Sequence, residues 1–169
     1  MNAGSPRSRR YFACARWPSP VFFLKDLPSR QMVEGYSDRF EGVDVGNVMD
    51  ALDLMRKASL LIRELEAYFA DHGFSQLRFL TLVVIDREPD RSSLMAGEVA
   101  DRLDVSKPVV TRVLRSLESA NLISIASSSD DARSREISLT AAGQAKLAEI
   151  MPGYFSILNR AMSSAKADS

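Results

Sequence analysis

The sequence LMAGEVADRLDVSKPVVTRVLRSLESANLISIASSSDDARSREISLTAAG at residues 94–143 changes its hydrophobic period along its length. Apolar residues recur every three or four positions over residues 96–103 and 107–117, which is typical of helices that bury one face. From residue 122 onward they alternate with polar residues, which is typical of half-buried strands. This order predicts a helix, a short turn, a second helix and a two-stranded hairpin.

The second of these helices is predicted to have two unlike faces. Ser106 is a favourable N-cap whose side-chain oxygen can accept an orphan backbone N–H, and Pro108 is tolerated in the first turn. One face is apolar and carries Val110, Val113, Leu114 and Leu117. The nearly opposite face carries Pro108, Thr111, Arg112 and Arg115, with Lys107 near its start. A basic outer face without acids, opposite a core-facing one, is what a DNA-reading helix needs.

Two polar residues are expected to adopt a left-handed backbone conformation around this helix. The preceding turn, residues 103–106, lacks the glycine that often occurs there, and Asp104 is one of the few other residues that accept this conformation. Asn121 is expected to do the same where the helix ends.

The hairpin is predicted from two short alternating segments. Residues 122–125 form the first strand, and Ile137 and Leu139 alternate with polar residues in the second. The polar run at 127–135 between them is expected to be a loop. Residues 92–94 are expected to add a short strand beside the hairpin, and Thr140 to cap a further helix.

Residues 131–143 carry a motif in which Asp-x-Arg is followed by apolar alternation and then by Leu-Thr-x-x-Gly. The motif resembles the wing of the MarR family of winged-helix transcription regulators, and the run from Ser106 to Arg112 resembles that family's recognition helix. The resemblance covers residues 46–162. It implies that Arg133 enters the DNA minor groove, where negative potential is enhanced, and that Asp131 orients it. Arg135 does not follow from the motif.

Long helical patterns flank this region, over residues 46–72, 75–88 and 141–165. Ser75 is the expected cap of the middle helix, which is apolar on most faces and therefore predicted to be buried. Pro152 is expected to kink or break the last one. The expected fold is mainly α with a small β-wing, in which a winged helix-turn-helix at 92–140 is flanked by long terminal dimerisation helices. The resemblance implies that these terminal helices interlock in an obligate homodimer.

Residues 1–45 form an N-terminal extension. Its first 20 residues are rich in Arg, Ser and Pro and contain no acid, so we expect them to be disordered. Residues 21–45 include an apolar run and are expected to pack on the base of the dimer, with Ser29 capping a short helix.

Composition sets limits on the function. The chain has 169 residues, of which 46% are hydrophobic and 26% charged, as in an ordinary soluble globular domain. No apolar run approaches the roughly 18 residues of a membrane span, and the single cysteine excludes an internal disulfide and fits the cytoplasm. The net charge of zero argues against a non-specific nucleic-acid coat.

The expected partner is double-stranded DNA with a pseudo-palindromic operator sequence. The residues expected to contact it are Ser106, Lys107, Pro108, Val109, Thr111, Arg112, Arg115 and Arg133. An arginine fork bonds guanine O6 and N7, and Thr111 is suited to a thymine methyl or a phosphate. The alternative is that these side chains are solvated charges on a winged-helix module that binds other proteins.

The remaining hypotheses concern regulation and catalysis. The resemblance implies a repressor released by a small, often aromatic or anionic effector, whose binding residues the sequence does not identify. A redox-sensing regulator acting through Cys14 is the other alternative. One histidine and one cysteine argue against a metal site or a catalytic triad, and we find no catalytic or cofactor motif, so we expect no enzyme and no cofactor. His72 is expected to interact with the last carbonyls of its helix or with solvent.

Overall fold

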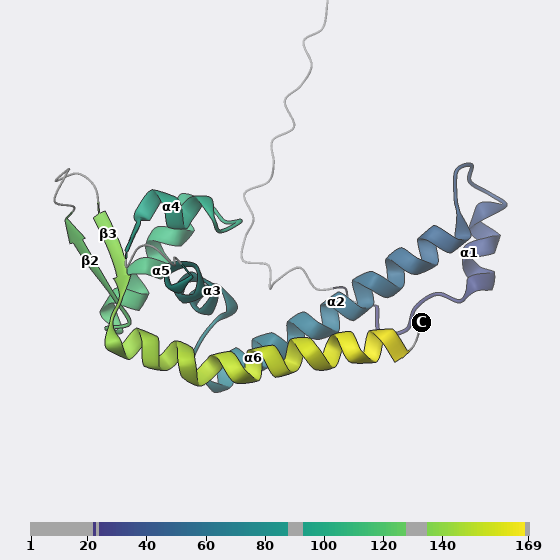
Figure 1. The fold of residues 1–169 in the computed structure, drawn as a ribbon. Helices are drawn as coiled ribbons and strands as arrows, with labels where there is room; N and C mark the ends of the chain where they lie inside the picture. Colours follow the sequence, from purple (N-terminus) through teal and green to yellow (C-terminus); the bar gives the residue numbers. More distant parts are fainter. Residues whose placement is uncertain (1–21, 23, 88–92, 128–134, 168–169) are drawn as a thin grey trace, which may run out of the picture. The chain divides into compact units, whose positions relative to one another are not determined.

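The structure is a computed structural model that describes residues 22, 24–87, 93–127 and 135–167. In chain order these residues form α1 (Arg30–Ser37), α2 (Val45–Asp71), α3 (Gln76–Asp86), β1 (Leu94–Met95), α4 (Ala96–Asp101), α5 (Lys107–Ser119), β2 (Ile123–Ser127), β3 (Arg135–Leu139) and α6 (Ala141–Ala167) (Figure 1). The chain divides into two compact units, and the boundary between Ser59 and Leu60 lies within α2. The mainly helical fold with a small β-wing agrees with the sequence-based prediction.

The first unit contains α1 and the N-terminal part of α2. Ser29 is the N-cap of α1, and its side-chain oxygen accepts a hydrogen bond from the backbone N–H of Met32 at 3.3 Å. Val33 is buried in this unit, whereas the larger apolar side chains of Met32, Tyr36 and Phe40 each expose more than half of their surface. Among the described residues, this unit therefore presents several exposed apolar side chains.

The second unit is built around α3, which packs against α4, α5, α6 and β3. Ser75 caps α3 as predicted, because its side-chain oxygen accepts from the backbone N–H of Arg78 at 3.3 Å. Phe79 and Leu82 are completely buried. A helix that is apolar on most faces is stable only where other elements surround it, and α3 has that position.

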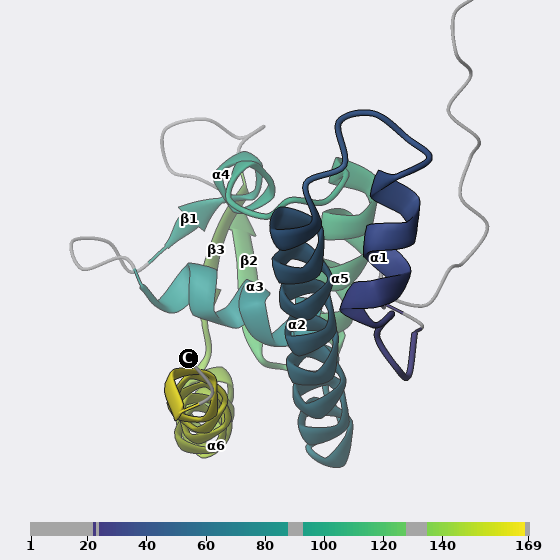
Figure 2. The same cartoon turned by 90° about the vertical axis from the view of Figure 1, so that its right-hand side faces the viewer.

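Three short antiparallel strands form the sheet, in the order β1-β3-β2 (Figure 2). Ile137 in the middle strand pairs with Leu94 of β1 and with Ile125 of β2. It is completely buried, and this fixes the register, because a slip by one residue would turn its side chain to the opposite face.

The beginning of α6 is bonded to the end of α5. Thr140 caps α6 as predicted, since its Oγ1 accepts from the backbone N–H of Gly143 at 3.0 Å. The same hydroxyl donates to the carbonyl of Asn121 at 2.7 Å, and the Thr140 N–H donates to the carbonyl of Leu122 at 3.1 Å. A Cβ atom on residue 143 would overlap the Leu122 carbonyl. Asn121, Leu122, Thr140 and Gly143 are here called the wing joint, and their contacts explain the Thr and the Gly of the Leu-Thr-x-x-Gly part of the motif.

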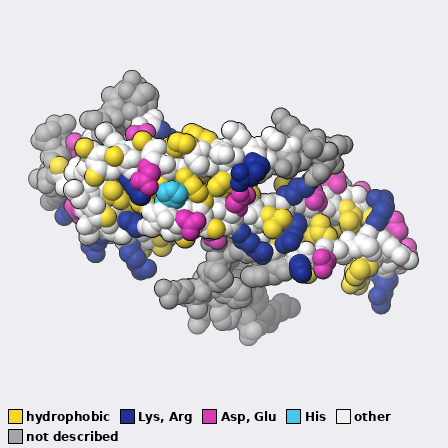
Figure 3. Space-filling model, turned by 90° about the horizontal axis from the view of Figure 1, so that it is seen from below, with side chains coloured by type: hydrophobic (Ala, Val, Ile, Leu, Met, Phe, Trp, Pro, Cys, Tyr) yellow, Lys and Arg dark blue, Asp and Glu magenta, His cyan; other side chains and the backbone are white. Residues whose placement is uncertain are grey.

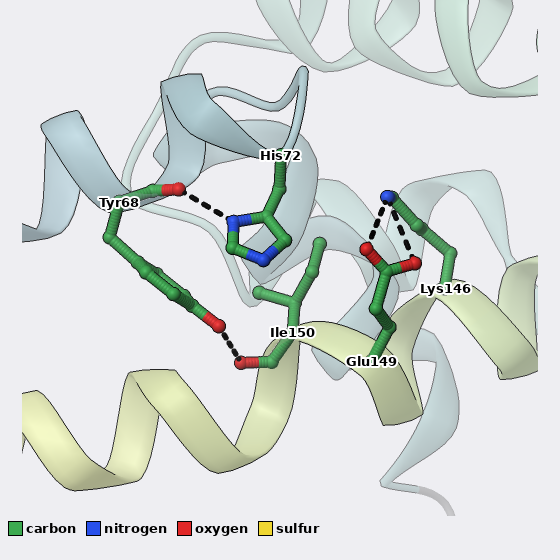
Figure 4. Close-up of polar contacts among 5 residues, drawn as sticks. All are labelled: Tyr68, His72, Lys146, Glu149 and Ile150. Carbon is green, nitrogen blue, oxygen red and sulfur yellow. Dashed lines mark hydrogen bonds and ion pairs between the residues drawn. The ribbon is translucent and has the colours of Figure 1, made fainter.

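The C-terminal part of α2 packs against α6 through Tyr68 (Figure 4). Its hydroxyl donates to the carbonyl of Ile150 at 2.8 Å, and a Cβ atom on Gly153 would overlap its ring. Pro152 was expected to kink or break α6, and the break does not occur, because the helix continues through this residue. The packing of Tyr68 against the turn that contains Pro152 and Gly153 holds this part of the helix in place.

None of the helices in the described part of the chain has both the length and the apolar character needed to cross a membrane.

Candidate nucleic-acid interface

The first helix of the helix-turn-helix is α4, and the carboxylate of Glu98 accepts a hydrogen bond from the backbone N–H of Met95 at its start, at 2.8 Å. Val99 and Ala100 are buried, on the face that the sequence predicts. In the turn that follows, the Val105 N–H donates to the Leu103 carbonyl at 2.8 Å.

The expectation of a left-handed Asp104 is wrong, because Asn121 is the only non-glycine residue with a positive φ in the described part of the chain. Asn121 has a φ of 57° where α5 has ended, as predicted. The turn before α5 therefore closes with ordinary backbone conformations, aided by the short hydrogen bond between Val105 and Leu103.

Ser106 is the N-cap of α5, but the expected side-chain capping bond is not formed. The residue at the second helical position is Pro108, which has no N–H to donate. The N–H of Val109, the third position, instead bonds the backbone carbonyl of Ser106 at 2.9 Å. The exposed hydroxyl of Ser106 therefore takes no part in capping the helix that it begins.

The burial of α5 follows the two predicted faces. Val110, Leu114 and Leu117 are buried, and Val113 packs against the same core. The opposite side chains are exposed, and they are Lys107, Pro108, Thr111, Arg112 and Arg115, with Val109 half-buried beside them. The Thr111 hydroxyl donates to the carbonyl of Lys107 at 3.0 Å, so its hydrogen is already engaged within the helix.

The outer face of α5 is basic. Within the part of the chain that the structure describes, no ion pair involves Lys107, Arg112 or Arg115. Glu118, one turn beyond Arg115, is the first acid within the helix. Three exposed cations that have no acidic partner among the described residues favour an anionic binding partner.

A groove lies between α5 and the strands beside it, and its volume is about 400 Å³. Its lining residues are Ala96, Thr111, Leu114, Arg115, Glu118, Ile125, Arg135 and Ile137. Sequence reasoning missed the groove, because it joins α5 to residues of β3 about twenty positions further along. The available signal was the spacing of Thr111, Arg115 and Glu118, which places them along one side of α5.

Three residues of the sequence-based hypotheses lie outside the described residues. They are Asp131 and Arg133 of the wing motif and Cys14 of the N-terminal extension. The structure brings the predicted residues of α5 together and gives no placement for these three.

His72 is half-buried and directly follows the last residue of α2. Its Nδ1 donates to the carbonyl of Tyr68 at 2.8 Å, as expected for a histidine that interacts with the last carbonyls of its helix. No group of three or more potential metal ligands occurs within the described residues.

Comparison with known proteins finds one family model that matches part of the chain. The sequence model of the MarR family matches residues 72–134. The HTH-type transcriptional repressor YetL of Bacillus subtilis (strain 168) is 29% identical over 139 residues, covering 82% of this chain and 83% of YetL.

Two solved structures extend the comparison. AbsC, a MarR family transcriptional regulator from Streptomyces coelicolor, has a TM-score of 0.68 at 17% identity, covering 75% of this chain and 84% of AbsC. The transcriptional regulator MOSR of M. tuberculosis, solved in complex with DNA, has a TM-score of 0.55 at 25% identity, covering 68% of this chain and 80% of MOSR. With its wing joint and helix-turn-helix, the chain is similar to the MarR family of winged helix-turn-helix transcriptional regulators.

Proposed function

We propose that this regulator is a homodimeric, sequence-specific repressor that places α5 in the major groove of double-stranded DNA. One observation carries the proposal: α5 buries one apolar face and exposes Lys107, Arg112 and Arg115 on the other, without acidic partners in the described residues. DNA supplies the phosphates and guanine edges that such a face is suited to bind.

The comparisons support this function. YetL, which matches over most of both chains, is named a transcriptional repressor. MOSR was solved in complex with DNA. We transfer repression and DNA binding from these proteins to this chain as a proposal.

Within the proposed interface, the N-terminal half of α5 reads the bases. We assign Arg112 to a guanine, since its exposed guanidinium can form two parallel hydrogen bonds to O6 and N7. Lys107 contacts a phosphate. Ser106, Pro108, Val109 and Thr111 border the same surface. The motif further assigns Arg133 to the minor groove, with Asp131 orienting it.

The apolar surface of the long helices supports the homodimer. Leu54 is 69% exposed on α2, and Phe155 and Met162 are 52% and 56% exposed on α6. Figure 3 shows exposed hydrophobic side chains between charged ones on one face of the molecule. Large apolar side chains on long helices are typical of surfaces that a partner covers. A second copy of the chain would also supply the second reading helix that a pseudo-palindromic site requires.

Release by a small-molecule effector completes the proposal, as the family resemblance implies. A compound that acts in this way should raise the melting temperature of the protein and lower its affinity for DNA, because it binds the folded state and disfavours the complex. The redox alternative rests on Cys14 and the interaction-module alternative on a solvated α5, and no contact of the described residues favours either.

The decisive experiment is selection of bound sequences from random duplex DNA with the purified protein. We expect one pseudo-palindromic sequence with half-sites about one helical turn, or a multiple of it, apart. Fluorescence anisotropy with the selected duplex should then give a much higher affinity than with a scrambled duplex. A folded dimeric protein that enriches no sequence would refute the proposal.

A further inference from the structure

The groove beside α5 has cations on both of its walls. Arg115 lies on the α5 wall, and Arg135, the first residue of β3, lies on the opposite wall. Both side chains are exposed, and neither forms an ion pair within the described residues. Arg115 and Arg135 bring two positive charges to one groove that Glu118, which also lines it, offsets only in part, and an anion in the groove would reduce the remaining repulsion.

The floor of the groove is apolar. Leu114 of α5, Ile125 of β2 and Ile137 of β3 form it, and Leu114 and Ile137 are buried. Thr111 also lines the groove, but its hydroxyl already donates to the carbonyl of Lys107. The groove therefore offers charge from two guanidinium groups and apolar contact with one half-buried side chain, Ile125. A sugar–phosphate strand matches both features, since its phosphates are anionic and its deoxyribose rings have carbon-rich faces.

The position of the groove favours the same occupant. In the proposed complex, α5 enters the major groove and the hairpin reaches toward the adjacent minor groove, so one DNA backbone strand must cross between them. The groove lies between α5 and the strands of that hairpin.

We propose that the groove holds this sugar–phosphate strand, with Arg115 and Arg135 contacting phosphates from its two walls. The inference rests on the proposed DNA-binding function and deepens it. It makes Arg115 a positioning residue for the duplex rather than a base reader, and it adds Arg135, which the sequence motif does not assign. Glu118, which also lines the groove, brings a negative charge toward the strand and limits its affinity.

The first test compares Arg115→Ala and Arg135→Ala by anisotropy on the selected duplex over a series of salt concentrations. Each variant should reduce the slope of log K against log[salt] by about 0.9, the value for one lost phosphate contact. Selected and scrambled duplexes should be weakened equally, because a phosphate contact carries no base information. Arg39→Ala, which removes an exposed arginine of the first unit, is the matched control and should leave the slope unchanged.

The second test locates the phosphates. Duplexes that carry one neutral methylphosphonate linkage at each successive position are bound by the wild type and by an Arg115→Ala/Arg135→Ala double variant. We expect the wild type to lose affinity at linkages between the major-groove and minor-groove contacts of each half-site. The double variant should be insensitive to the same linkages, because the side chains that contact them are absent.

The outcomes distinguish a failure of the groove proposal from a failure of the proposed DNA-binding function. If Arg112→Ala loses base preference while both groove variants keep the wild-type slope, the groove does not hold the strand, although the DNA-binding function stands. A groove reserved for a small anion would give that result. A change in the preferred base with Arg135→Ala would overturn the phosphate assignment. If the wild type selects no sequence at all, the proposed function itself fails.

Glu118→Gln, in the same groove, should change the affinity for DNA in the opposite direction from the two arginine variants. Removing this charge should tighten binding to both duplexes by roughly twofold to fivefold, the usual range for one exposed charge interaction. Unchanged or weaker binding by a folded Glu118→Gln protein would contradict the proposal that a phosphate lies nearby.

Discussion

The Tyr68 hydroxyl donates a 2.8 Å hydrogen bond to the carbonyl of Ile150, and this bond ties α2 to α6 immediately before Pro152. Tyr68→Phe removes the donor and keeps the ring. We expect a loss of about 1 kcal/mol in the free energy of unfolding, the usual contribution of one such bond. Urea denaturation followed by circular dichroism at a fixed protein concentration measures it. Equal midpoints for the two proteins would show that the bond contributes nothing.

The wing joint predicts a contrast between two glycines. Gly143→Ala would drive a Cβ atom into the Leu122 carbonyl, and we expect it to destabilise the protein by about 1–3 kcal/mol or prevent folding. Gly97→Ala in α4 is the control, because a Cβ atom there meets nothing within 4 Å. It should be neutral or stabilise by about 0.5–1 kcal/mol through helix propensity. Thermal melts of both variants give the comparison, and equal effects would contradict it.

Arg112→Ala and Lys107→Ala are expected to weaken DNA binding in different ways. Arg112→Ala should cost about 1–3 kcal/mol at the selected sequence and relax the preference at one base pair. Lys107→Ala should weaken all sequences about equally and lower the salt slope by about one. A panel of single-base operator variants, bound at several salt concentrations, distinguishes the two. Unchanged binding by both folded variants would refute the assignment of α5.

The internal hydrogen bond of Thr111 predicts what this residue offers to DNA. With its hydroxyl engaged by the Lys107 carbonyl, its methyl group remains for a thymine methyl. Thr111→Val should therefore bind nearly as the wild type does. Thr111→Ser should lose about fourfold in affinity, the equivalent of one apolar carbon.

Replacing thymine by uracil in the selected duplex is the control for the Thr111 variants. It should remove the difference between Thr111→Ser and the wild type, since the methyl on the DNA side is then absent. A larger loss with Thr111→Val than with Thr111→Ser would show that the hydroxyl is the contact.

The dimer is tested on the exposed face of α6. Phe155 is 52% exposed in the single chain, so Phe155→Glu should leave the fold of the chain intact while it places a charge in the proposed interface. We expect light scattering to show a monomer and circular dichroism to show near-native helix content. Ser156→Glu, at the exposed neighbouring position, should remain dimeric. A wild-type protein that is monomeric at micromolar concentration would exclude the dimer directly.

Local sequence signals predicted the elements well where one residue type has one dominant role. Ser75, Thr140 and Asn121 have the conformations or capping bonds expected of them. Ser106 is the N-cap as expected, but its side chain does not form the expected bond. Pro108 has no N–H, and the N–H of Val109 donates to the backbone carbonyl of Ser106 instead.

The prediction was weaker where distant residues determine the outcome. Pro152 remains inside α6, where the turn that contains it packs against Tyr68 from another helix. The groove was not predicted, since Arg115 and Arg135 line it together only once the hairpin of β2 and β3 has packed against α5 through β2. The wing motif identified Asp131 and Arg133 by resemblance, and their roles stay predictions.

The wing joint also makes the connection between α5 and α6 independent of the length of the hairpin. The chain leaves α5 at Asn121 and Leu122 and returns at Thr140, and the two ends are bonded to one another. Residues 123–139 are thus a segment inserted between α5 and α6, and hydrogen bonds join the residues on either side of it. Insertions or deletions within residues 123–139 change the entropy of closing this segment only slowly with its length. The reach of this part of the protein toward a partner can therefore be altered, in evolution or by design, without changing how α5 is joined to α6.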